Sequence, residues 1–275
     1  MDILALLRER AEERGGYSVV PYSWCRTIAV RASISPRQVE IAALEGAICP
    51  SRYERNMGTI GLAGQIKLLR SCVGVLGCGG LGGYIIEMLA RAGVGSLVLI
   101  DGDTFSESNL NRQLLCTEEK MGKNKAEAGR DRVQSINSVV EVRACTEYFR
   151  DENADALLQG CDLVLDALDN NTSRLLALRA CAKVEIPFIH GAIAGFWGQV
   201  GVFYPGDTTP WTEAEALPDK GAELQTGNPS FTPAFIAALE VAEAIKVITN
   251  MSTSLRHQLL WFDLEQGDMQ KIRLS

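Results

Sequence analysis

The sequence predicts an α/β fold with a Rossmann-like, mostly parallel sheet, an antiparallel extension of that sheet and a short helical N-terminal extension. Three observations support this prediction. From Val73 to Asp101, a buried strand, a cluster of glycines, an amphipathic helix and a second strand follow one another. Strand and helix patterns then alternate as far as His190, which favours right-handed crossovers and parallel strands. Beyond it, Trp197 to Phe203 alternates like an antiparallel strand, and a closing hairpin follows.

The composition is that of a soluble globular protein and argues against several functional classes. The chain has 275 residues, of which 47% are hydrophobic and 22% charged, enough for one large domain or two small ones. Its net charge of −7 argues against a protein built to coat DNA or other nucleic acid. No run of 18 apolar residues occurs, so we expect no membrane span, and the first residues lack the features of a signal peptide.

The cysteines indicate a cytoplasmic protein. None of the eight forms a CxxC pair, and several lie in apolar strand or helix patterns. We therefore predict reduced, mostly buried thiols rather than a disulfide framework. The cysteines are Cys25, Cys49, Cys72, Cys78, Cys116, Cys145, Cys161 and Cys181.

Residues 1–50 precede the glycine cluster and are predicted to form a helical extension. An amphipathic helix is expected over Ile3–Glu13, and a second helix has strong start signals, with Ser35 as N-cap and Pro36 and Gln38 in its first turn. Two short helices around a turn can bind DNA, but this segment lacks a dense basic face. The extension either packs on the main domain or clamps a partner or a second subunit.

The segment from Ser51 to Ser71 is expected to form two helices separated by a glycine break. Gly58 and Gly61 provide the break, because glycine is unfavourable in a helix interior. Arg52 and Arg55 lie one turn apart on the first helix. Taken alone, this spacing is typical of a solvated helix face.

The glycine cluster predicts a phosphate-binding loop. Gly77, Gly79, Gly80 and Gly82 lie within six residues, between the strand and the helix. Glycine lets the backbone approach an anion, and the N–H groups at the helix N-terminus point at it. Asp101, at the end of the second strand, can bind ribose hydroxyls. The turn alone does not separate NAD, FAD, SAM and ATP as ligands.

The remaining elements follow in order to the C-terminus. A polar loop follows Asp101, and its length suggests a function. A loop over 204–229, rich in proline, glycine and threonine, is long enough to be a mobile lid. The expected elements are helices over Gly122–Asn137, Asn153–Leu158, Asn170–Lys183 and Phe231–Ile248, and strands over Val139–Cys145, Asp162–Asp166, Ile186–His190, His257–Phe262 and Met269–Leu274.

Charged residues follow the predicted carboxyl ends of the parallel strands, where such sheets bind ligands. Arg112 in the polar loop and Lys125 on the next helix bring positive charge, and Asp169 follows the fourth strand. An enzyme that binds a nicotinamide cofactor does not need these three charged residues, whereas an enzyme that binds a nucleoside triphosphate does. Attack at its α-phosphate adds charge to the leaving pyrophosphate, which Arg and Lys stabilise, and Asp169 can hold a bridging magnesium ion. We therefore predict that ATP and Mg²⁺ bind here.

Four segments resemble a known family: GCGGLG, LIDGDTFSESNLNRQ, MGKNKA and LVLDALDN. They resemble the ubiquitin-activating-enzyme-like superfamily, in particular its bacterial HesA/MoeB/ThiF members, from about Ser51 to about Leu274. The resemblance implies a ThiF-type adenylation domain over 51–275, with a crossover loop at about 204–229. It also implies a homodimer that adenylates the C-terminal Gly-Gly carboxylate of a ubiquitin-like sulfur-carrier protein, in molybdopterin, tungstopterin or thiamin synthesis.

The resemblance also implies a role for each matching residue of the nucleotide site. The glycines match the family's phosphate loop, and two neighbouring acids match its ribose-binding position. Three residues of the SNLNRQ segment and one lysine match its phosphate-binding side chains. The implied nucleotide-binding residues are Gly77, Gly79, Gly80, Gly82, Asp101, Asp103, Asn109, Arg112, Gln113 and Lys125.

Four residues are implied in catalysis: Arg55, Arg112, Lys125 and Asp169. Asp169 matches the family's magnesium-associated acid. Arg55, in the segment RYERN, matches the arginine that reaches the ATP of the partner subunit. Asn56 stands where the family usually has glutamine.

Two departures from the family pattern concern cysteine. Many relatives hold a structural zinc with two CxxC pairs, but Pro210 and Trp211 stand where the first pair is expected and no cysteine follows Cys181, so we expect no zinc. Relatives that form a thioester or persulfide carry a cysteine before the Phe231 helix, where this chain reads AELQTGNPSF. Cys116 in the polar loop is an alternative nucleophile, although a structural role is favoured.

Three alternative functions are weighed against this one. A branch that resembles tRNA threonylcarbamoyladenosine dehydratase adenylates a carboxylate on tRNA, but it should have a basic surface. A non-catalytic ATP-binding scaffold subunit tends to lose the Arg, Lys or Asp that this chain keeps. A plain NAD-dependent oxidoreductase does not need those charges.

Overall fold

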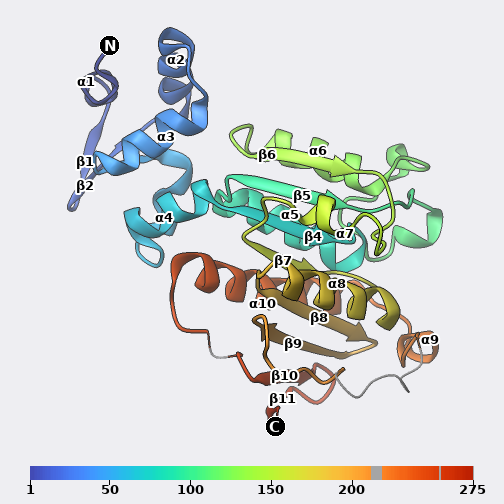
Figure 1. Ribbon diagram of the computed structural model, residues 1–275. Coiled ribbons are helices and arrows are strands. Elements are labelled where there is room, and N and C mark those ends of the chain that lie inside the picture. Colours follow the sequence, from blue (N-terminus) through green and yellow to red (C-terminus); the bar gives the residue numbers. More distant parts are fainter. Residues whose placement is uncertain (212–218, 254, 275) are drawn as a thin grey trace.

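The computed structural model describes residues 1–211, 219–253 and 255–274 of the chain (Figure 1). A large sheet covered by helices forms the main body, and a smaller N-terminal unit lies at one end of it. Within the described ranges, no helix combines the length and the apolar character needed to cross a membrane. Residues 212–218 of the predicted lid lie outside these ranges.

The main sheet has eight strands, and their pairing confirms the predicted fold class. Its strands are β4 (Cys72–Leu76), β5 (Ser96–Ile100), β6 (Glu141–Cys145), β7 (Leu163–Asp166), β8 (Phe188–Ala194), β9 (Trp197–Phe203), β10 (Gln258–Asp263) and β11 (Asp268–Arg273). They lie in the order β11-β10-β9-β8-β7-β4-β5-β6. The pairs from β8 to β6 are parallel, and the pairs from β8 to β11 are antiparallel.

One face of the sheet is covered by α5 (Gly80–Ala92), α6 (Lys125–Ile136) and α10 (Phe231–Thr249). The apolar side of α5 buries Ile85 against the strands, as its helical periodicity predicts. α10 packs against α5 and also against β8 and β9, where it buries Ile236. Because α10 meets neighbours on several sides, it is apolar on most of its surface.

The other face of the sheet is covered by α7 (Ala154–Leu158), which contacts β5, and α8 (Asn171–Lys183), which contacts β7. They bury Leu157 and Ala177 in a second hydrophobic cluster. Farther along this face, Trp211 packs on Phe203 with ring centroids 5.4 Å apart.

The N-terminal unit contains more than the predicted helices. Its elements are α1 (Ile3–Arg8), β1 (Glu12–Arg14), β2 (Tyr17–Val20), α2 (Tyr22–Ala32), α3 (Pro36–Glu45) and β3 (Ile48–Pro50). The helix expected over Ile3–Glu13 ends at Arg8, because the chain then turns back as the β1–β2 hairpin. The start of α3 is as predicted: Ser35 and Gln38 form a reciprocal capping box.

The junction between the two parts is η1 (Ser51–Asn56), a 3₁₀ helix, followed by α4 (Gly61–Arg70). Arg52 is not on a solvated face: its guanidinium lies 3.5 Å from the buried Glu40 carboxylate and donates to Asn137. Arg55, on the same short helix, is exposed. The solvated-face interpretation is therefore wrong for Arg52, because α3 covers that side of η1.

Candidate active site

A pocket of about 880 Å³ opens at the carboxyl ends of β4, β5, β7 and β8, as expected for a parallel sheet. Most predicted site residues line it, and Gly82 and Arg55 are the exceptions among them. The predicted residues in the lining are Gly77, Gly79, Gly80, Asp101, Asp103, Asn109, Arg112, Gln113, Lys125 and Asp169.

The glycine loop needs glycine for two separate reasons. Gly77 has a φ of +91°, and a Cβ there would lie 2.6 Å from the carbonyl oxygen of Ala167. A Cβ at Gly82 would lie 1.9 Å from the carbonyl oxygen of Gly77, so this glycine brings α5 against the loop without touching the pocket. Gly79 and Gly80 line the cavity at the start of α5 and leave its N-terminal N–H groups open to an anion.

Asp101 is tied to the glycine loop. Its Oδ2 accepts a hydrogen bond from the Cys78 amide at 2.7 Å, and its Oδ1 accepts one from the Asp103 amide at 2.8 Å. Burial outweighs these bonds and raises the pKa of the Asp101 carboxyl above its usual value. Each carboxylate oxygen has two lone pairs, so Asp101 can still accept from a ribose hydroxyl while it holds the loop.

Lys125, Asp103 and Tyr148 form a hydrogen-bonded set on one wall. Lys125 is the first residue of α6, which begins there rather than at Gly122 because Asn124 caps the helix. Its Nζ lies 3.0 Å from Asp103 Oδ2, and the Tyr148 hydroxyl donates to Asp103 Oδ1 at 2.7 Å. Desolvation opposes ionisation of Asp103, but these two donors outweigh it and lower its pKa.

The SNLNRQ segment supplies the next part of the wall. The Asn109 side chain accepts from the Ser106 amide at 3.1 Å and fixes the short turn before Arg112. Arg112 bonds the Ser108 carbonyl at 3.0 Å. Gln113 is buried, and its Oε1 has no hydrogen-bond partner among the described residues. A buried acceptor without a hydrogen-bond partner on a pocket wall is available to a donor group of a ligand.

Asp169 follows β7 and faces the pocket with an exposed side chain. The sequence shows no partner for it, but Lys220 of the crossover segment lies 2.6 Å from its Oδ2. Partial desolvation raises the pKa of Asp169, and the Lys220 hydrogen bond more than offsets this, so the net shift is downward. Within the described ranges, no three Asp, Glu, His or Cys side chains gather as a metal site.

The described part of the crossover segment closes one side of the pocket. Trp211, Asp219, Lys220, Leu224 and Asn228 are among the lining residues. The segment is tied to the start of α8, where the Thr172 amide donates to the Asp219 side chain at 2.9 Å.

A buried network under the pocket was not predicted from the sequence. Asp166 at the end of β7 accepts from Arg174 of α8 and from His190 of β8, each at 2.7 Å. His190 is in turn 3.0 Å from the side-chain nitrogen of Gln199 on β9. The predicted strand Ile186–His190 extends to Ala194, and β7–β8 pairing sets Asp166 opposite His190.

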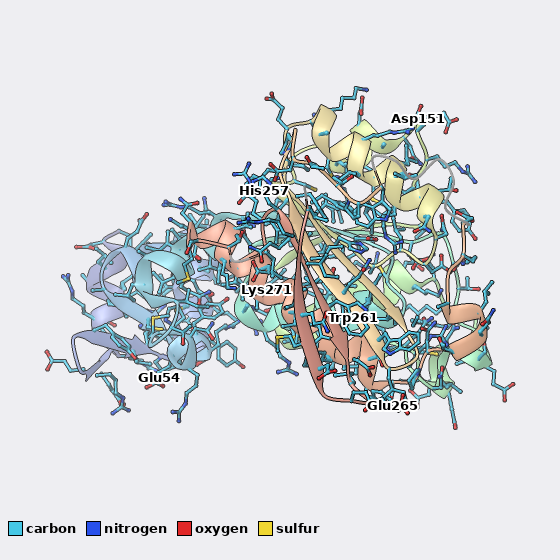
Figure 2. All side chains as sticks on the ribbon, turned by 90° about the horizontal axis from the view of Figure 1, so that it is seen from below. Glu54, Asp151, His257, Trp261, Glu265 and Lys271 are labelled. Carbon is cyan, nitrogen blue, oxygen red and sulfur yellow. The ribbon has the colours of Figure 1, made fainter. Side chains whose placement is uncertain are left out.

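Arg55 is not among the described residues that line the pocket. Figure 2 shows its chain neighbour Glu54 at the end of the molecule that holds the N-terminal unit, away from Trp261, which lines the pocket. Within one chain, therefore, Arg55 lies outside the pocket that Lys125 lines.

The pocket fits a nucleoside triphosphate by the chemistry of its donors. The helix N-terminus, Arg112 and Lys125 present donors for phosphate oxygens, while Asp101 and the Oε1 of Gln113 present acceptors for hydroxyls. Two acidic side chains stand beside these donors: Asp103, which is paired with Lys125, and Asp169.

The chain is similar to known proteins in sequence and in fold. The model of the ThiF family matches residues 53–275. The chain is 35% identical over 232 residues to the sulfur carrier protein adenylyltransferase of Thermus thermophilus, covering 80% of this chain and 86% of that protein. It is 33% identical over 237 residues to the adenylyltransferase and sulfurtransferase MOCS3 of Culex quinquefasciatus, covering 82% of this chain but only 52% of that protein. A crystal structure of E. coli MccB with ATP has a TM-score of 0.71 over 82% of this chain and 72% of that one, at 23% identity, which shows a shared fold.

Proposed function

The chain belongs to the ThiF family, and we propose that it is an ATP-dependent adenylyltransferase for the C-terminal Gly-Gly carboxylate of a ubiquitin-like sulfur carrier. The observation that carries the proposal is the convergence of Arg112, Lys125 and the glycine loop on one pocket beside Asp169. The similarity to a sulfur carrier protein adenylyltransferase supports the choice of substrate.

In the proposed reaction, a carboxylate oxygen of the carrier attacks the α-phosphorus of ATP. The bond from that phosphorus to the oxygen bridging to the β-phosphate breaks, and pyrophosphate leaves with the electron pair. The products are a carrier acyl-adenylate and pyrophosphate, and no proton is transferred. Negative charge grows on the leaving group, so Lys125 and Arg112 act by stabilising it.

Asp169 is proposed as the residue that holds Mg²⁺. A single carboxylate fits this role, because Mg²⁺ at phosphate sites takes one or two carboxylates and completes its shell with water and phosphate oxygens. When bound, the ion supplies charge neutralisation at the phosphates. The exposed Asp169 carboxylate and its ion pair with Lys220 on the pocket wall suit a group that exchanges partners.

We further propose a homodimer in which Arg55 reaches the partner's pocket. The position of Arg55, exposed and outside the lining of its own chain's pocket, supports action between subunits. On this view residues 51–275 form the adenylation domain, and residues 1–50 form an extension whose helix α3 contacts η1 through the Glu40–Arg52 ion pair.

The crossover segment is proposed to cover the carrier's tail. Trp211, Lys220 and Asn228 of that segment lie along the pocket, and a Gly-Gly tail is narrow enough to pass beneath them. Residues 212–218 of the crossover segment lie outside the described part of the chain.

Pyrophosphate exchange tests the proposed function. Purified enzyme is incubated with ATP, Mg²⁺ and labelled pyrophosphate, together with carriers of the thiamin and molybdopterin types that end in Gly-Gly, including the sulfur carrier protein of Thermus thermophilus, or with tRNA. We expect label to enter ATP only with a Gly-Gly carrier, and not with a carrier that lacks its last glycine. Exchange with tRNA alone, or with no acceptor at all, would overturn the proposal.

A further inference from the structure

Gln199 on β9 connects the buried network to the open pocket. Its side chain is partly buried and lies in the pocket lining, with its nitrogen 3.0 Å from His190 Nε2. Because side chains alternate along a strand, Gln199 shares a face with Trp197, and the β9–β10 register places Trp261 directly opposite Gln199. Both tryptophans also line the pocket.

The hydrogen-bond direction in the network is set by Asp166. Its Oδ2 accepts from Arg174 Nε at 2.7 Å, and its Oδ1 accepts from the Leu168 amide at 3.0 Å. Desolvation opposes ionisation of Asp166, but Arg174 and His190 outweigh it and lower its pKa, so the group is a carboxylate. A carboxylate only accepts, and therefore His190 Nδ1, 2.7 Å away, carries the proton of that bond.

His190 is neutral in this environment. Its side chain is fully buried, and burial lowers its pKa to about 4 in spite of the Asp166 carboxylate. A neutral imidazole with its proton on Nδ1 has an acceptor at Nε2. The Gln199 amide must then present its NH₂ group to His190, which leaves Gln199 Oε1 as the group free to meet a ligand.

Gln199 Oε1 receives no hydrogen bond from any described residue. Its neighbours on the pocket face are the tryptophan rings and the small side chain of Ala192, which β8–β9 pairing sets opposite Gln199. The groove at this point is thus an apolar wall with one fixed acceptor, and it selects a ligand with one donor in an otherwise apolar stretch.

We propose that Gln199 is a substrate-binding residue whose Oε1 accepts a hydrogen bond from one backbone N–H of the carrier's extended tail, and that His190 is the residue that positions it. This inference rests on the proposed function. A tail that ends in two glycines has no side chains there to recognise, so its main-chain groups must carry the recognition. An acceptor of fixed orientation is suited to read an N–H.

Backbone ester substitution tests this contact directly. The last four backbone amides of the Thermus thermophilus carrier, or of whichever carrier supports exchange, are replaced one at a time by esters through ligation of a synthetic tail. An ester keeps the shape of the tail but removes one N–H donor. With the wild-type enzyme, we expect one of the four esters to raise the carrier KM about tenfold while kcat changes little.

The variants Gln199→Leu and His190→Phe then test whether the sensitive N–H of the tail donates to Gln199 and whether His190 positions that residue. Both should raise the KM for the all-amide carrier and abolish the difference between amide and ester at the sensitive position, with an unchanged KM for ATP. Gln258→Leu, on β10, is the matched control and should keep the full difference. The amide-to-ester ratio is measured within one enzyme preparation, so partial misfolding of a variant does not alter it, and Gln199→Ala provides a second variant.

The outcomes separate this inference from the proposed function. Two results would overturn the role of Gln199 and leave adenylation intact. The first is pyrophosphate exchange with the all-amide carrier but no ester position that raises the KM. The second is a Gln199→Leu variant that keeps the full difference between amide and ester. Ester sensitivity retained in His190→Phe overturns the positioning role of His190. Absence of exchange with every carrier overturns the proposed function, and the inference falls with it.

Discussion

Arg174 Nε donates to Asp166 Oδ2 at 2.7 Å, and the same guanidinium donates to the Leu168 carbonyl at 3.0 Å. Asp166 in turn accepts from the Leu168 amide at 3.0 Å. The residue just before Asp169 is therefore held at both its N–H and its C=O by one buried ion pair. This arrangement connects the stability of the fold to the position of the proposed magnesium ligand.

Arg174→Met should destabilise the protein and reduce the rate of pyrophosphate exchange. It leaves the buried Asp166 carboxylate without its main partner, which costs on the order of 3–5 kcal/mol of the unfolding free energy. Urea denaturation measures this change. Arg179→Met, at an exposed position on the same helix, is the control and should change the unfolding free energy by less than about 0.5 kcal/mol. A variant at Arg174 as stable as the control would contradict a structural role for the pair.

Asp169→Ala should abolish magnesium-dependent exchange, by about 100-fold or more, while the fold stays intact. The side chain is exposed, so its loss leaves no cavity. Exchange is measured across a range of Mg²⁺ concentrations, with Asp155→Ala, an exposed acid on α7, as the control. Wild-type exchange in Asp169→Ala would remove this residue from the reaction.

Arg55→Ala and Lys125→Ala should each be inactive alone and active when mixed. If Arg55 acts in the partner's pocket, a heterodimer of the two variants contains one intact site. Random exchange of subunits in an equal mixture then restores about a quarter of wild-type activity. Exchange of subunits is followed with differently tagged chains. If subunits are shown to exchange but activity does not recover, Arg55 does not act in the partner's pocket.

Glu40→Gln should remove a pH dependence of stability. Burial raises the pKa of Glu40 from 4.5 to about 7, and Arg52 only partly offsets this. The folded chain therefore keeps a proton that the unfolded chain releases, so this stabilisation is complete below about pH 4.5 and is lost as the pH rises through 7. The shift corresponds to about 3 kcal/mol.

The measurement is urea denaturation of wild type and variant at pH 5 and pH 8. The variant should gain up to about 3 kcal/mol relative to wild type between these two conditions. Glu45→Gln, at an exposed position on the same helix, should show no such gain. Equal pH dependence in wild type and Glu40→Gln would show that Glu40 titrates normally.

Enzyme, ATP and carrier should give a carrier–AMP species and no thiol-sensitive conjugate. All eight cysteines are described, and none is exposed. Burial raises the pKa of the Cys116 thiol, which disfavours the nucleophilic thiolate. Mass spectrometry of the quenched mixture decides the point: an enzyme–carrier conjugate cleaved by reductant, and lost in Cys116→Ser, would show a covalent step.

Local signals explain why much of the fold was predictable. The strand, glycine loop and helix from Val73 to Ala92 depend on residues near one another in the chain, and so do the Ser35 cap and the long α10. The strands β1 and β3 were missed because each has only three residues, too few to show an alternation of apolar and polar side chains. α2 was missed because it starts after Pro21 without a side-chain cap.

The pocket lining was predictable for residues that belong to a sequence motif, but not for contacts between residues far apart in the chain. Lys125 and Arg112 belong to recognisable segments, and both line the pocket. The partnership of Asp166 with His190 depends on the register of β7 against β8, which no local pattern encodes. The same holds for Lys220, which meets Asp169 from 51 positions away.

The tryptophans make the pocket accessible to fluorescence spectroscopy. Trp197, Trp211 and Trp261 line it, and the chain's fourth tryptophan, Trp24, lies in the N-terminal unit. Trp211 sits edge-on to His190 with ring centroids 4.4 Å apart and is shielded from water, whereas Trp197 is open to it. Intrinsic emission therefore combines a blue-shifted signal from Trp211 of the crossover segment with a red-shifted one from Trp197 on the groove wall, and each reports on a different part of the same cavity, while the buried Trp24 adds a blue-shifted background from the N-terminal unit.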